Sequence, residues 1–267
     1  MEAPIGVFDS GIGGLTVLAA LREALPHERF VYLGDTARLP YGTKSDQTVA
    51  RYAVQAAQAL VRRGVKCLVV ACNTASAVGL EAVRAQARGV PVIGVIEPGA
   101  QAACAASRTG HIAVIATEAT VRGGAYERAI LKRRPDARVV QLSTQLLVAL
   151  AEEGLVLGPV AAGAVAHYLA PLFAAEPLDT LVLGCTHFPV LAPTIRDVVG
   201  PQVRIVDSAH TTALAVREQL AAARIARRSG AQTVQFVATD GAERFARVGG
   251  RFLGHAIESA QVELIDL

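Results

Sequence analysis

The sequence lacks any long apolar segment. No apolar run approaches the roughly 20 residues that a membrane-spanning helix needs, and residues 1–4 lack the basic and apolar regions of a signal peptide. We therefore expect a soluble, cytoplasmic protein that makes no contact with a membrane. With 267 residues, 52% of them hydrophobic, the chain has ample core material for one large or two ordinary domains.

The chain also carries little net charge. Its formal charge at pH 7 is +3, and its arginines are scattered apart from short basic runs at 131–134 and 226–228. Such runs usually form the solvated end of a helix, whereas a nucleic-acid-binding domain gathers its basic residues on one face. We expect no nucleic-acid partner.

Cysteines are few as well. Four cysteines in a cytosolic chain of this size do not indicate a disulfide framework. No close pair of cysteines or histidines has the spacing of a structural zinc site. Cys67 and Cys104 lie in apolar or alanine-rich surroundings, so we expect both to be small buried hydrophobic residues. Cys72 and Cys185 differ, because each ends an apolar run and is followed by polar residues.

These two cysteines occur in matching contexts, LVVACNTAS at 68–76 and LVLGCTH at 181–187. An uninterrupted apolar run of this length is typical of a central strand in a parallel sheet, buried on both faces. Each cysteine then lies at the carboxyl end of its strand, which is the edge where open α/β sheets bind ligands. A single cysteine in such a place is more often inert than reactive. Its repetition beside Asn, Thr and His favours a reactive pair.

Strands and helices alternate along the chain, and the pattern occurs twice. The first set of expected strands is 5–8, 30–33, 67–71 and 90–96, with helices at about 15–25 and 45–63 and a third ending near residue 88. The second set, at 111–117, 138–143, 181–184 and 203–208, follows at an offset of roughly 110 residues. This predicts an α/β fold of two similar parallel-sheet lobes related by internal pseudo-symmetry.

The chain continues after the second set. We expect a helix to about residue 228, a strand at 233–237 and a last helix around 241–253. We assign these elements to the first lobe, which is then discontinuous: residues 1–97 with 208–267, while 98–207 form the second lobe. If the carboxyl strand edges of the two lobes face each other, Cys72 and Cys185 lie on opposite walls of one cleft.

Two thiols on opposite walls suggest a specific reaction. A carbon atom held between them can lose a proton to one thiolate and gain a proton from the other thiol, which inverts its configuration. The ordinary cysteine pKa of ~8.5 falls at helix N-termini and beside cationic groups, which is where the sequence places both cysteines.

Four segments together resemble the signature segments of the glutamate racemase family. They are GVFDSGIGGL at 6–15, GDTARLPYG at 34–42, ACNTA at 71–75 and LGCTHFP at 183–189. The resemblance covers essentially the whole chain. It implies cofactor-independent interconversion of L- and D-glutamate by a homodimeric isomerase, which supplies D-glutamate for peptidoglycan synthesis and so for the cell wall and cell shape. In that family the cysteine matching Cys72 deprotonates D-glutamate, and the cysteine matching Cys185 deprotonates L-glutamate.

The resemblance implies further site residues. Besides the cysteines, it gives catalytic roles to Asp9, His187 and Glu152, and it matches Asp35 to an acidic position that supports the bases. The implied substrate contacts are Asp9, Ser10, Tyr41, Gly42, Asn73, Thr74, Thr117, Thr120, Thr186 and His187. Hydroxyls, an amide and backbone N–H groups suit the carboxylates of glutamate, and Asp9 suits its ammonium. The chain departs from the family pattern at 144–148 and at Ala116, where glycine is usual, so Glu152 is matched less closely.

The residues alone leave other functions open. A metal site formed by Cys72, Cys185 and His187 is possible by ligand type. A two-lobed binding protein needs the cleft but not the thiols. A pyridoxal-phosphate racemase needs a Schiff-base lysine, and the three lysines, Lys44, Lys66 and Lys132, have no convincing cofactor context. We expect neither a metal nor a cofactor.

The alternative nearest to glutamate racemisation is a sibling of the same fold. An aspartate or hydantoin racemase, or a related decarboxylase, would share the same lobes. Decarboxylases of this kind can work with one cysteine, so the pair favours racemisation. Substrate length is harder to infer, because one methylene group in a pocket changes discrimination by only ~1–3 kcal/mol.

Overall fold

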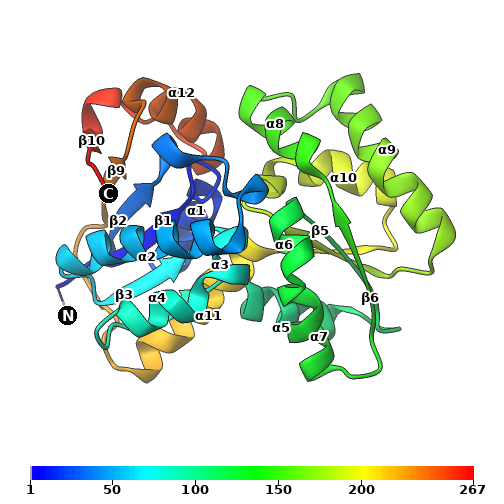
Figure 1. Cartoon of the computed structure of the whole chain (residues 1–267), viewed down its shortest axis with the longest axis horizontal. Coiled ribbons are helices and arrows are strands. Elements are labelled where there is room, and N and C mark those ends of the chain that lie inside the picture. Colours follow the sequence, from blue (N-terminus) through cyan, green and yellow to red (C-terminus); the bar gives the residue numbers. More distant parts are fainter. Residues whose placement is uncertain (1) are drawn as a thin grey trace.

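The computed structural model describes residues 2–267, which form two α/β lobes side by side (Figure 1). The first sheet has the strand order β10-β9-β2-β1-β3-β4, and the second has the order β6-β5-β7-β8. Every strand pair in both sheets is parallel. The expected parallel-sheet α/β class is therefore confirmed. The order β2-β1-β3-β4 in one lobe matches β6-β5-β7-β8 in the other, as a duplicated unit predicts.

Most strands lie close to the positions that their apolar runs predict. They are β1 (Ile5–Asp9), β2 (Arg29–Gly34), β3 (Cys67–Val70), β4 (Val92–Gly94), β5 (His111–Ala116), β6 (Arg138–Ser143), β7 (Thr180–Gly184), β8 (Arg204–Asp207), β9 (Thr233–Ala238) and β10 (Val262–Leu264). All residues of β1, β3 and β7 are buried, because helices cover both faces of each sheet.

The helices of the first lobe form two layers. Helix α1 (Leu15–Ala24) packs with α11 (Ser208–Ala222) and α12 (Ala242–Leu253) on the face that carries Val7 and Val69. Helices α2 (Asp46–Arg62) and α4 (Leu80–Gln86) cover the other face, which carries Phe8 and Val70. The alternation of side chains along a strand thus divides each apolar run between two cores.

The remaining helices surround the second sheet or connect the lobes. They are α3 (Asn73–Val78), α5 (Ile96–Ala106), α6 (Glu118–Gly123), α7 (Ala125–Arg133), α8 (Gln145–Glu153), α9 (Gly158–Ala175) and α10 (Ala192–Val199). Short 3-10 turns occur at Thr36–Arg38, Tyr41–Thr43, Phe188–Leu191 and Ser259–Gln261.

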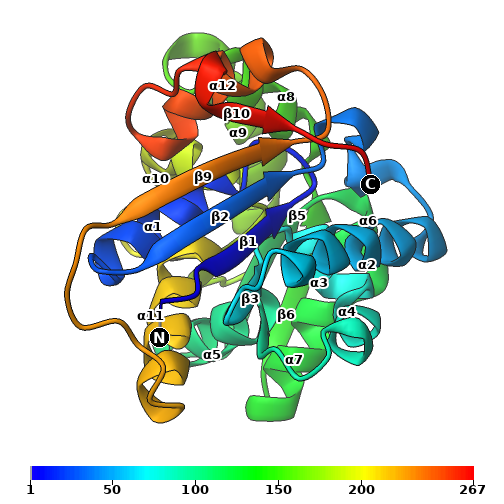
Figure 2. The same ribbon diagram turned by 90° about the vertical axis from the view of Figure 1, so that its left-hand side faces the viewer.

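The C-terminal segment returns to the first sheet. Strand β9 pairs with β2, and β10 pairs with β9 at the edge of that sheet, as Figure 2 shows. Helix α11 packs mainly on α1 and also contacts α5. The lobe limits at 97/98 and 207/208 remain a prediction.

Several element boundaries were predicted wrongly. The strand expected at 90–96 is only Val92–Gly94, and Ile96 begins α5 instead. Short apolar runs fit either a buried strand or a buried helix, and Pro98 is tolerated in a first helical turn. The helix after Cys72 is broken at Gly79, where an added Cβ would lie 3.2 Å from Ala50 Cα of α2. Helix α11 ends at Ala222 rather than near 228, and β10 was not predicted.

Helix α9 differs from the expectation that no segment is long and apolar enough to span a membrane. Its 18 residues have a mean hydropathy of 1.3, and only 17% of them are buried. By length and composition alone it could cross a membrane, but one such helix is weak evidence. Its buried side chains, Ala161, Val165 and Leu169, belong to the core that continues toward the first lobe.

Candidate active site

The first cysteine turn is formed by the end of β3 and the start of α3. Cys72 is the N-cap residue of α3, and its Sγ accepts a hydrogen bond from the backbone N–H of Ala75 at 3.4 Å. The same sulfur donates to Ser10 Oγ at 3.4 Å. Burial and the nearby charge of Asp9 raise the pKa of Cys72 to about 12, despite these hydrogen bonds. In this arrangement Cys72 is a protonated thiol, which can donate a proton.

The second cysteine turn follows β7 and contains a chain of polar contacts. Cys185 Sγ lies 3.7 Å from Nδ1 of His187, and His187 Nε2 lies 3.1 Å from Oε1 of Glu152. Glu152 Oε2 accepts a hydrogen bond of 2.8 Å from Arg244, on helix α12 of the first lobe. Cys185, His187, Glu152 and Arg244 therefore form one chain across the two lobes.

His187 has an unusual protonation equilibrium. Burial lowers its pKa, but the interactions with Cys185 and Glu152 outweigh burial and raise the pKa to about 10. In turn, the hydrogen bond to His187 lowers the pKa of Glu152. The structure thus favours an imidazolium beside Cys185. The two cysteines have unlike surroundings, because Cys72 faces a carboxylate and Cys185 faces a cation.

The Cys72 turn meets the second lobe through a cluster of three threonines. Thr74 Oγ1 lies 2.9 Å from Thr117 Oγ1 and 3.3 Å from Thr120 Oγ1, and the last two atoms are 3.0 Å apart. Thr117 and Thr120 follow β5, so the end of β3 in one lobe is joined to the end of β5 in the other. All three hydroxyls are buried.

The Cys185 turn meets the first lobe in the corresponding way. Thr16 Oγ1 donates to the carbonyl oxygen of Thr186 at 2.9 Å. A Cβ added to Gly13 would lie 2.5 Å from both the His187 ring and Thr186 Oγ1. The turn after β1 therefore contacts the turn after β7, while the turn after β3 contacts the turn after β5. The carboxyl edges of the two sheets face each other, with a cysteine on each edge.

Asp9 lies between these turns at the end of β1. Its side chain is fully buried, and Oδ2 accepts a hydrogen bond of 3.0 Å from the Gly11 N–H. Oδ1 has no hydrogen-bond partner among residues 2–267. Burial raises the pKa of Asp9, although His187 opposes this effect. A buried oxygen without a partner is costly, so Asp9 is suited to a cationic or proton-donating group of a ligand.

The loop that carries Tyr41 and Gly42 is held by Asp35. The Tyr41 hydroxyl donates to Asp35 Oδ2, and Arg38 Nε donates to both oxygens of Asp35, at 3.0 and 2.7 Å. Asp35 makes no hydrogen bond to Cys72 or Cys185, so its position suits the support of this loop rather than of a base. Gly42 approaches the other lobe closely: a Cβ there would lie 2.8 Å from Thr117 Cβ.

The predicted site residues thus form two groups. Asp9, Ser10, Cys72, Asn73, Thr74, Thr117, Thr120, Cys185, Thr186, His187 and Glu152 lie at or beside the facing edges. Tyr41 and Gly42 join them through the Asp35 loop. Arg244 and Tyr126 were not predicted. Asn73 Nδ2 donates to the Tyr126 hydroxyl at 2.8 Å, and no local pattern on α7 or α12 marks either residue.

The other two cysteines lie outside this site. Cys67 is fully buried, as expected, and burial raises its pKa to about 12. Cys104 is only partly buried, so its predicted burial is incomplete. Among residues 2–267, no group of three or more His, Cys, Asp or Glu side chains is arranged to hold a metal ion.

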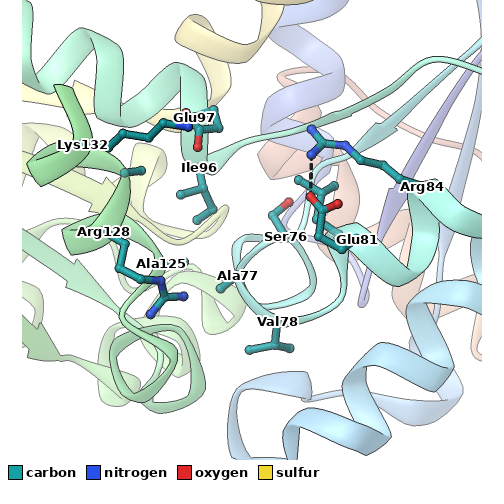
Figure 3. Close-up of a pocket in the computed structure, with 12 residues that line it drawn as sticks. Ser76, Ala77, Val78, Glu81, Arg84, Ile96, Glu97, Ala125, Arg128 and Lys132 are labelled. Carbon is teal, nitrogen blue, oxygen red and sulfur yellow. Dashed lines mark hydrogen bonds and ion pairs between the residues drawn. The ribbon is translucent and has the colours of Figure 1, made fainter.

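A separate cavity of about 280 Å³ lies beyond the far end of α3 (Figure 3). Ala77 and Val78 of α3 and Glu81 and Arg84 of α4 line one side, and Arg128 and Lys132 of α7 line the other. Glu81 and Arg84 pair with each other at 2.6 Å. Neither Cys72 nor Cys185 lines this cavity, so it is distinct from the facing cysteine turns.

The sequence of this chain is similar to those of known racemases. Residues 12–216 match the Asp/Glu/Hydantoin racemase family. The chain is 49% identical to a glutamate racemase of Geobacter metallireducens, over 94% of this chain and 92% of the relative.

The fold of this chain is also similar to solved structures of glutamate racemases. The crystal structure of glutamate racemase from Francisella tularensis in complex with D-glutamate is 34% identical, with a TM-score of 0.92 over 99% of this chain and 98% of that chain. The enzyme from Thermus thermophilus in complex with beta-chloro-D-alanine is 43% identical, with a TM-score of 0.89 over 100% and 98% of the two chains. The chain therefore belongs to the Asp/Glu/Hydantoin racemase family.

Proposed function

We propose that this protein interconverts L- and D-glutamate by proton transfer to and from Cys72 and Cys185. The observation that carries this proposal is the facing pair of cysteine turns, each at the carboxyl edge of its own sheet. The high identity to glutamate racemases over nearly the whole chain supports glutamate as the substrate. A small-molecule substrate is in keeping with a site formed by short, buried polar side chains.

From L-glutamate, the reaction begins at Cys185. Its thiolate takes the α-proton, so that an S–H bond forms, the Cα–H bond breaks, and the electron pair remains on the α-carbon. Cys72 then donates its thiol proton to the opposite face of that carbon and is left as a thiolate. From D-glutamate the same steps run in reverse. The resting arrangement, with an imidazolium beside Cys185 and a protonated Cys72, is suited to the L enantiomer.

The proposed roles of the other residues follow from their positions. His187 stabilises the Cys185 thiolate, and Glu152 holds the His187 ring through Nε2. The unpartnered Oδ1 of Asp9 accepts a hydrogen bond from the substrate ammonium. The other contacts to glutamate come from the remaining polar groups, which are Ser10, Tyr41, Gly42, Asn73, Thr74, Thr117, Thr120 and Thr186.

The proposal extends to the setting of the enzyme. It works without a metal or an organic cofactor, as a homodimer in the cytoplasm, and its D-glutamate supplies peptidoglycan synthesis. The active site lies between a lobe of residues 1–97 with 208–267 and a lobe of residues 98–207. The identity to relatives named as glutamate racemases supports D-glutamate as the product.

A racemisation assay tests the proposed function directly. Circular dichroism follows the loss of ellipticity from enantiopure L- and D-glutamate and, in parallel, from L- and D-aspartate. We expect rapid racemisation of glutamate and little of aspartate, and we expect Cys72→Ala and Cys185→Ala each to lower kcat by about 100-fold or more. A preparation that racemises aspartate faster would identify the substrate as the shorter amino acid. Normal turnover by either variant would overturn the two-cysteine reaction.

A further inference from the structure

Tyr126 lies between the two cysteine turns, although it touches neither sulfur. It is the second residue of α7, its side chain is fully buried, and its ring packs in the core of the second lobe with Ile112 of β5 and Val182 of β7. Its hydroxyl accepts the 2.8 Å hydrogen bond from Asn73 Nδ2. Asn73 directly follows Cys72, so this bond crosses from the second lobe to the first.

The ring of Tyr126 is fixed against the other cysteine turn. Gly184 directly precedes Cys185, and a Cβ there would lie 3.0 Å from Tyr126 Cε2 and 2.9 Å from the carbonyl oxygen of Ile115. A Cβ at Gly99 would lie 3.1 Å from the opposite edge of the ring. With both sides of the ring in close contact, the position of the hydroxyl is set by the core of the second lobe.

The hydrogen bond to Tyr126 determines which polar atom of Asn73 remains free to bind the substrate. Asn73 is only 2% exposed, and its Nδ2 is used by Tyr126, while Oδ1 has no hydrogen-bond partner among residues 2–267. Burial raises the pKa of Tyr126, so its hydroxyl stays neutral at physiological pH and can accept this bond. A buried amide oxygen without a partner, beside a catalytic cysteine, is suited to a hydrogen-bond donor of the substrate.

We propose that the Tyr126 hydroxyl is a positioning group, which fixes the Asn73 amide from across the lobes so that Oδ1 is presented to the substrate ammonium. This inference rests on the proposed racemisation and adds a residue to it. Because the bond joins α7 to α3, the Asn73 amide is fixed only when the two lobes are together. Substrate binding and lobe contact are thereby linked through one side chain.

Tyr126→Phe removes the hydroxyl, with its interactions with Asn73 and Ser208, and keeps the ring against Gly184 and Gly99. Loss of the acceptor leaves a buried amide donor unsatisfied, so we expect kcat/KM for glutamate to fall by about 10-fold. The fall should lie mainly in KM, because Asn73 contacts the substrate in both the ground state and the transition state. Tyr168→Phe is a matched control, since Tyr168 is partly buried and its hydroxyl makes no hydrogen bond within residues 2–267, and this variant should behave as the wild type.

A double-mutant cycle separates positioning from a general effect on the fold. If Tyr126 acts through Asn73, then Tyr126→Phe should change kcat/KM by less than about twofold in an Asn73→Ala background. An equal loss in both backgrounds, or no loss in the wild-type background, would overturn the proposal. Asn73→Ala alone should raise KM by about 10-fold, and a wild-type KM would refute the inference even if Tyr126→Phe folded poorly. Absence of racemisation by the wild-type protein would instead contradict the proposed function.

Discussion

The contact between His187 and Glu152 yields the most informative single perturbation. Glu152→Gln keeps the size of the side chain and removes its charge. His187 Nε2 then loses an ionised partner at 3.1 Å, and Arg244 loses its 2.8 Å acceptor. The side chains of His187 and Glu152 are only 10% and 17% exposed, so water replaces little of the lost interaction.

The size of the effect follows from the energy of one buried, charge-assisted hydrogen bond. Such a bond contributes about 1.5–3 kcal/mol, which corresponds to a change of about one to two pH units in the titration of His187. Because Glu152 favours the protonated ring, its replacement lowers the pKa of His187 from about 10. The basic limb of the kcat/KM profile should therefore move to lower pH, by about one to two units.

The assay is the pH dependence of kcat/KM for both enantiomers, followed by circular dichroism. L- and D-glutamate have equal free energies, so kcat/KM must fall by the same factor in both directions. Glu153→Gln is the matched control, because the adjacent Glu153 is exposed and forms no hydrogen bond or ion pair with the residues that the structure describes. A Glu152→Gln profile that superimposes on that of the control would refute the role of Glu152 in holding His187 protonated.

Three further predictions test the geometry. Gly13→Ala should lower kcat/KM by about 100-fold or more, because its Cβ would lie 2.5 Å from His187 and Thr186. Gly163 on α9 has open space around it, so Gly163→Ala is the control and should raise the free energy of unfolding in urea by ~0.5–1 kcal/mol. Since the pKa of His187 is raised in the folded state, its contribution to the free energy of unfolding is complete below about pH 6.5 and is lost as pH rises to about 10. Wild type should accordingly lose more stability than His187→Asn over that range, and parallel curves would contradict this. Dialysis against a chelator and treatment with hydroxylamine should leave racemisation unchanged, whereas activity restored by added metal would count against the cofactor-free reaction.

The sequence was sufficient to predict the strands that carry the chemistry. Residues 67–71 and 181–184 are apolar throughout because helices cover both faces of β3 and β7, and an uninterrupted apolar run reports that burial directly. The cysteines then follow at the carboxyl edge by geometry alone. Helix and strand boundaries that depend on tertiary contacts were harder to predict. Gly79 divides α3 from α4 where the backbone comes close to Ala50, and the pattern of apolar residues in the sequence cannot predict that contact.

The site was only partly predictable for the same reason. Motifs adjacent to the cysteines identified Asn73, Thr186 and His187, whose positions along the chain are tied to the strands. Arg244 and Tyr126 reach the site from helices distant in sequence, and each is one of several polar residues on an amphipathic helix. Asp35 shows the converse. Its acidic character matched a family position, while its contacts with Arg38 and Tyr41 direct it toward a loop.

The central claim is that the two cysteines act on opposite faces of one substrate, and isotope exchange in the serine variants tests it most directly. Each variant keeps one cysteine, so racemisation should fail while α-proton exchange in D2O survives for one enantiomer. NMR should show Cys72→Ser exchanging the α-proton of L-glutamate through Cys185, and Cys185→Ser exchanging that of D-glutamate through Cys72. If both variants exchange the same enantiomer, the cysteines do not flank the substrate and the account is wrong.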